Sequence, residues 1–126
     1  MEIRRHRLEP VENAPKHETG ARDEQQSLDT LTAAIVNAID VSGMLHPAIE
    51  IIRNYDQKNQ SNLLHTLDVY LLNDCNAQHC GRLLFLHRNS LVYRIRRIQD
   101  IAGIDLSDPD ERSYLRLSFL LWKAQH

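Results

Sequence analysis

Residues 76–97 read NAQHCGRLLFLHRNSLVYRIRR, and this stretch decides the fold predicted for the chain. It holds five arginines, two histidines and no acidic residue, whereas the 126-residue chain has a formal net charge of −2. Gly81 and Leu84 are spaced to share one face of a short helix, and residues 85–87 then interrupt the helical period. The period resumes at steps of four, three and four with Leu91, Ile95, Ile98 and Ala102. Two helices joined by a tight turn fit this pattern, which predicts a helix-turn-helix.

The second helix of this pair, predicted over residues 88–101, carries the candidate DNA contacts. With about 100° per residue and Leu91 at the centre of its buried face, Tyr93 and Arg96 point to the opposite side. Recognition helices present their N-terminal residues to base edges, where arginine binds guanine and asparagine binds adenine. The predicted base-reading residues are Arg88, Asn89, Ser90, Val92 and Tyr93. The residues predicted to contact phosphates, which set affinity rather than sequence preference, are Arg82, His87, Arg96 and Arg97.

The alternative interpretation of this basic stretch is a solvated surface helix. Solvated helix faces usually mix both signs of charge. No acidic residue occurs in the 25 residues from Cys75 to Gln99. The stretch therefore favours a polyanionic partner, and double-stranded DNA is the partner that we expect.

Several separated motifs follow one known pattern. The segments HRNSL (87–91), YRI (93–95), GIDL (103–106) and DP (108–109) resemble the C-terminal helix-turn-helix signature of the PucR family of bacterial transcription regulators, which includes the sugar-diacid regulators. Upstream, HP (46–47), YD (55–56) and LHTL (64–67) also resemble that family, so the likeness spans about 45–121. It implies a small all-α bundle that contains a Fis-like helix-turn-helix and binds DNA.

Two positions depart from the pattern of the PucR family, which usually has Ser or Thr where Gln78 stands and Ala where Gly81 stands. Glutamine is a poor N-cap, and glycine weakens a helix by about 1 kcal/mol relative to alanine. We therefore expect the first helix of the motif to be less stable than is usual in that family.

The chain divides into three predicted segments. Residues 1–26 lack a helical or strand period and are predicted to form a flexible tail. Residues 27–44 are predicted to contain an amphipathic helix, capped by Ser27 or Asp29, with nothing in its own neighbourhood to pack against. We expect this helix to act as a dimerisation segment. The alternatives are pairing through the final helix, and a monomer in which both helices fold back onto one core. Residues 45–126 form the predicted DNA-binding domain.

Helical periods within 45–126 predict a small bundle. Pro47 suits the first turn of one helix, residues 56–60 read as a polar connector, and Ser61 is the expected cap of the next helix. Asp108 and Glu111 supply an N-cap and a capping-box acid for the final helix. No strand-like alternation of useful length occurs, so the predicted fold is all-α.

Composition and motifs argue against several function classes. No apolar run approaches the roughly 20 residues of a membrane span and no secretory signal is present, so we expect a cytoplasmic protein with free thiols. A glycine-rich phosphate loop, HExxH and paired carboxylates are all missing from the sequence, so we expect no enzyme and no cofactor. The four nearby zinc-ligand types are Cys75, His79, Cys80 and His87. Their spacing differs from the CxxC pairs of most zinc sites, so we expect no metal.

Two functions remain compatible with the sequence. One is a sequence-specific DNA-binding transcription regulator, or its output domain, and the basic stretch favours it. The other is a helical dimerisation or partner-docking module that kept the fold without specific DNA binding. We expect a homodimer, because one helix-turn-helix buries little surface on DNA and paired copies bind half-sites about one helical turn apart. Members of the resembled family usually carry large sensory domains, so the chain is either a fragment or a short stand-alone member. The effector, the operator and the sign of regulation stay open.

Overall fold

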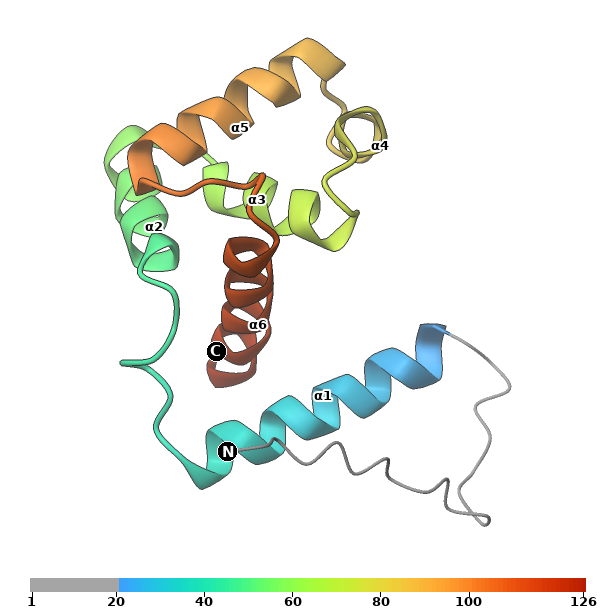
Figure 1. Ribbon diagram of the computed structural model, residues 1–126, viewed down its shortest axis with the longest axis vertical. Helices are drawn as coiled ribbons and strands as arrows, with labels where there is room; N and C mark the ends of the chain where they lie inside the picture. Colours follow the sequence, from blue (N-terminus) through green and yellow to red (C-terminus); the bar gives the residue numbers. More distant parts are fainter. Residues whose placement is uncertain (1–20) are drawn as a thin grey trace, which may run out of the picture.

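The computed structural model describes residues 21–126, with side chains from Asp23 onward, and there the chain forms six helices and no strand (Figure 1). The helices are α1 (Ala21–Ala38), α2 (Ala48–Asn59), α3 (Leu63–Leu72), α4 (Ala77–Leu83), α5 (Arg88–Ala102) and α6 (Pro109–Gln125). The prediction of an all-α bundle is confirmed. Over this described range, none of the helices combines the length and the apolar character that crossing a membrane requires.

The centre of the bundle is α3, which contacts α2, α4, α5 and α6. α5 packs on α2 and α3 and joins α4 through a short turn (Figure 1). The main core residues are Ile49, Ile52, Leu63, Leu67, Leu71, Leu91, Ile95, Ile98, Leu115 and Phe119. Because three of these residues come from α5, the core holds one face of α5 and leaves its opposite face to solvent.

α1 begins at Ala21, six residues before the predicted start, so the prediction of a tail is wrong for residues 21–26. Residues 1–20 of the predicted tail lie outside the described residues. The expectation that this helix lacks a packing surface is also wrong, because it packs against α6. Thr32 on the packed face is only 5% exposed, and its hydroxyl donates to the carbonyl oxygen of Leu28 at 3.1 Å. α1 crosses α6 at the end of the molecule opposite to α5 (Figure 1).

The junction between α2 and α3 differs from the prediction. The residues predicted as a connector, 56–60, continue α2 as far as Asn59. Asp56 then caps the next helix from across the turn: its carboxylate accepts from the backbone N–H groups of Leu63 and Leu64, both at 2.9 Å. Ser61, the predicted cap, instead donates its hydroxyl to the same carboxylate at 2.6 Å. The carboxylate thus satisfies two N–H groups that have no partner within α3.

A buried histidine joins the start of α2 to α6. The backbone N–H of His46 donates to Ser118 Oγ at 2.9 Å, and its Nδ1 accepts from the backbone N–H of Ala48 at 3.0 Å. Its Nε2 lies 3.0 Å from a carboxylate oxygen of Glu111. Asp108 caps α6 as predicted, by accepting from the backbone N–H of Asp110. Glu111, however, pairs with His46 rather than closing a capping box.

Candidate nucleic-acid interface

The first helix of the motif, α4, is capped by Asn76, whose side chain accepts from the backbone N–H of His79 at 3.0 Å. Gln78 lies inside the helix, so the expected weakness from a glutamine cap does not arise. Gly81 approaches the following turn closely, since a Cβ added there would lie 2.8 Å from the carbonyl oxygen of Leu86. Glycine at 81 weakens the helix relative to alanine, but it leaves the space that the tight turn into α5 requires.

The second helix, α5, starts at the predicted residue and ends at Ala102, one residue later than predicted. His87 caps it: the imidazole Nδ1 accepts from the backbone N–H of Asn89 at 3.1 Å. Gly103 ends the helix in the left-handed conformation at φ 66°, as a C-terminal glycine is expected to do. Both ends of the helix are thus fixed by local sequence.

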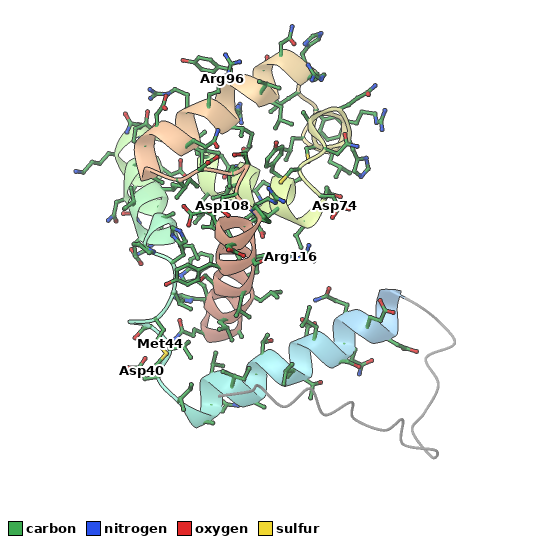
Figure 2. The ribbon with its side chains drawn as sticks, in the orientation of Figure 1. Asp40, Met44, Asp74, Arg96, Asp108 and Arg116 are labelled. Carbon is green, nitrogen blue, oxygen red and sulfur yellow. The ribbon has the colours of Figure 1, made fainter. Side chains whose placement is uncertain are left out.

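The predicted faces of α5 are confirmed by burial. Leu91 and Ile98 have no exposed surface, and Ile95 is 6% exposed. On the opposite side, Tyr93 is 65% exposed. Arg96 lies on the same outer side and points away from the bundle (Figure 2).

The residues predicted to read bases gather at the N-terminal end of α5. Arg88, Asn89 and Ser90 form its first turn and are all exposed. Tyr93 follows one turn later on the outer face, whereas Val92 is half-buried on a flank. The structure therefore presents one guanidinium, one amide, one hydroxyl and one phenol at a single helix end, a set that offers hydrogen-bond donors and acceptors to base edges.

The four residues predicted to contact phosphates occupy different environments. Arg82, in the last turn of α4, and Arg96 are exposed. His87 is exposed too, but one of its ring nitrogens is occupied by the helix cap. Arg97 is half-buried: its guanidinium donates to the hydroxyl of Tyr55 on α2, and its central carbon lies 5.7 Å from the centre of that ring.

The arginines of the two helices carry uncompensated charge. Within residues 21–126, no ion pair forms between an acid and any of the five arginines of this region, which are Arg82, Arg88, Arg94, Arg96 and Arg97. The ion pairs His46–Glu111, Arg53–Glu50 and Lys123–Asp68 all lie outside α4 and α5. Five arginines on two adjoining helices, with no acidic partner among the described residues, are suited to a polyanion.

The cysteine and histidine residues of the region do not form a metal centre in the described structure. No group of three or more potential ligands comes together among residues 21–126. Cys80 is fully buried and Cys75 is half-buried, and both are free thiols. Burial raises the pKa of each thiol, which disfavours the thiolate that a metal or a redox reaction requires.

Comparison with known proteins agrees with this geometry. A profile of the PucR C-terminal helix-turn-helix domain matches residues 63–121, which hold α3, α4, α5 and most of α6. Residues 63–121 are therefore similar to this helix-turn-helix domain, which is named for a family of DNA-binding regulators.

Three proteins with known names are similar to part of this chain. The chain is 39% identical over 77 residues to the proline-responsive transcriptional activator PutR of Bacillus subtilis, covering 61% of this chain and 19% of that protein. It is 33% identical over 79 residues to the purine catabolism regulatory protein of the same organism, covering 63% and 15%. It is 33% identical over 63 residues to the carbohydrate diacid regulator of Escherichia coli, covering 50% and 16%. The chain thus spans less than a fifth of each relative, and no solved structure matches it significantly.

Two features of the bundle were not predicted from the sequence. The contact between Tyr55 and Arg97 joins residues 42 positions apart, and no local pattern announces it. The left-handed backbone of Phe85, at φ 56°, lies in the turn between α4 and α5. The left-handed conformation at Phe85 had a signal in the sequence. The first helix must end between Leu84 and His87, and a helix end commonly needs one left-handed residue. Because no glycine or asparagine occurs there, a bulky residue has to adopt that conformation.

Proposed function

We propose that the chain binds double-stranded DNA sequence-specifically, with the N-terminal end of α5 in the major groove, and thereby acts as the output domain of a transcription regulator. One observation carries the proposal. The exposed end of α5 combines Arg88 and Asn89 with arginines that have no acidic partner among the described residues. Arginine and asparagine are the side chains that bind guanine and adenine bidentately.

Roles follow from position on the helix. Arg88, Asn89, Ser90 and Tyr93 read base edges, and Val92 contacts bases from the flank of α5 through its methyl groups. Arg82, His87, Arg96 and Arg97 neutralise or approach phosphates on either side of the groove. Each arginine that neutralises one phosphate adds about 0.9 to the slope of log affinity against log salt.

The test begins with selection of a preferred duplex from a random-sequence pool by the 126-residue chain. Asn89→Ala should weaken binding to the selected duplex by roughly 1–3 kcal/mol and change binding to an unrelated duplex far less. Asn54→Ala, an exposed asparagine change on α2, is the matched control and should bind as the parent does. If the parent showed no salt-dependent binding to either duplex, the domain would have to be a partner-docking module instead.

We infer that the chain pairs as a homodimer through the side of α1 that faces away from α6. Leu31 on α1 is 58% exposed, Ile39 just beyond the end of α1 is 52% exposed, and Leu117 on the neighbouring α6 is 52% exposed. Two copies bind more tightly than one because they occupy two half-sites. α1 and α5 lie at opposite ends of the molecule (Figure 1). Both α5 helices can therefore contact one duplex only if the two copies lie side by side with their α5 ends pointing the same way.

Light scattering at micromolar concentration tests the dimer. Leu31→Glu places a charge on the exposed side of α1, so it should produce monomers without disturbing the face that packs on α6. Lys58→Glu, an exposed change on α2, is the control. A parent chain that is already monomeric rules out the dimer, and a Leu31→Glu variant that stays dimeric moves the interface away from α1.

A further inference from the structure

Phe85 is the most exposed of the large apolar residues that the structure describes, with 95% of its surface open to solvent. It lies in the turn between α4 and α5, and its φ of 56° is in the left-handed region. A single exposed apolar side chain is ordinary, but bulky residues avoid this backbone region because Cβ crowds the carbonyl oxygen. Here both features coincide in one residue.

The turn is a Schellman motif. The backbone N–H of Leu86 donates to the carbonyl oxygen of Gly81 at 2.7 Å, and that of Phe85 donates to the carbonyl oxygen of Arg82 at 3.3 Å. The left-handed position of this motif is usually glycine. At the end of α5 the same chain uses Gly103, at φ 66°, in the matching position. Phenylalanine at 85 therefore stabilises this turn less than glycine would. The side chain also buries almost no surface within the folded chain.

The surroundings of Phe85 indicate what covers it. Arg82 precedes the turn and His87 follows it, and both are exposed. Leu83, 48% exposed, adds apolar surface beside them. A partner at this position must accept positive charge next to an apolar group. The DNA backbone does so, because charged phosphates alternate with deoxyribose rings along each strand, and the turn is continuous with the face of α5 assigned to DNA.

Given the proposed docking of α5, on which this inference rests, we propose that Phe85 packs against deoxyribose rings of the strand that borders the major groove. The ring then fixes how the first turn of α5 enters the groove. Because the contact is apolar and involves the backbone of DNA, it contributes affinity on every sequence and neutralises no phosphate.

Phe85→Gly in the full chain separates folding from binding. Glycine relieves the left-handed strain, so the unfolding midpoint should equal or exceed that of the parent. Affinity for both the selected duplex and an unrelated duplex should fall roughly tenfold, the loss expected when about 55 Å² of apolar contact disappears. The salt slope should stay unchanged. Phe85→Asn, which tolerates the same backbone conformation without adding glycine's flexibility, should lose affinity to a similar extent.

Two further variants serve as controls. Phe85→Leu keeps an apolar side chain and should retain most of the affinity. Met44→Ala removes an exposed apolar group between α1 and α2, far from α5, and should bind as the parent does (Figure 2).

Three results overturn the proposal. Parental affinity in Phe85→Gly means that DNA does not cover the ring, and a loss confined to the selected duplex means that it touches a base. A lowered unfolding midpoint means that the ring packs within the chain. Arg96→Ala distinguishes this failure from failure of the docking itself. If only Arg96→Ala weakens binding, α5 docks without Phe85; if neither variant does, the proposed docking is wrong.

Discussion

Arg97 is expected to stabilise the fold, whereas its neighbour Arg96 is not, and the sequence alone does not suggest this difference. The Arg97 guanidinium donates to the hydroxyl of Tyr55 and lies against the ring of that residue, whereas Arg96 is exposed and has no ion-pair partner among the described residues. We therefore predict that Arg97→Ala weakens both DNA binding and the fold, and that Arg96→Ala weakens DNA binding alone.

The size of the stability loss follows from the two contacts. A hydrogen bond to a charged group contributes about 1.5–3 kcal/mol, and the lower end applies because Arg97 is only half-buried. The cation–π contact adds about 0.5–1 kcal/mol at a partly exposed site. Arg97→Ala should thus lower the free energy of unfolding by about 2 kcal/mol, Tyr55→Phe by about 1.5 kcal/mol, and Arg96→Ala by less than about 0.5 kcal/mol.

Thermal unfolding followed by circular dichroism measures these differences, since 1 kcal/mol shifts the midpoint by about 4–8 °C in a domain of this size. A salt titration of DNA binding should give a slope lowered by about 0.9 for each arginine variant and unchanged for Tyr55→Phe. Equal midpoints for the Arg96 and Arg97 variants would refute the role of Tyr55. An unchanged salt slope for Arg97→Ala would leave Arg97 with a structural role only.

Three more predictions follow from particular contacts. Asp56→Ala removes the cap of α3 and should lower the free energy of unfolding by about 1–2 kcal/mol in urea titrations, whereas Asp110→Ala, an exposed acid whose side chain caps no helix, should have little effect. Burial raises the pKa values of Tyr70, Cys75 and Cys80, so their protonated forms favour the folded state. This contribution is complete below about pH 8.5 and is lost as pH rises through the raised values, so unfolding should require less urea near pH 10.5 than near pH 8. Asp100→Asn should strengthen binding to all duplexes only modestly in anisotropy titrations; a large gain would mean that the carboxylate lies against phosphates and that the duplex runs along the whole outer face of α5.

Local sequence was sufficient to predict the recognition helix and its faces. Leu91, Ile95 and Ile98 repeat at helical spacing, and all three are buried. The start of α6 at Asp108 was predicted as well, because its cap depends on residues within one turn of the helix end. The grouping of Arg88 and Asn89 on one exposed turn follows from the same period.

Contacts between distant residues could not be predicted in this way. Asp56 was assigned to a connector because DQKNQ is polar throughout, yet its carboxylate caps α3 seven and eight positions later. His46 meets Glu111 across 65 positions, so a capping box that is plausible from spacing gives way to a contact between helices. The packing of α1 on α6 likewise depends on how the bundle closes. Each of these contacts exists only after the helices have been brought together.

The distribution of charge along α5 constrains how the helix can meet DNA. Asp100 is nine residues beyond Leu91, which places it about 180° from the buried face and therefore on the same side as Tyr93 and Arg96. It is exposed and is the first acid after the basic stretch. A duplex lying along the whole outer face would bring this carboxylate against phosphates. Entry by the N-terminal end avoids that repulsion, because about 16 Å of helix separates Asn89 from Asp100 while the major groove is about 8.5 Å deep. We therefore expect the groove to hold the first two turns of α5 and the acid to remain outside it.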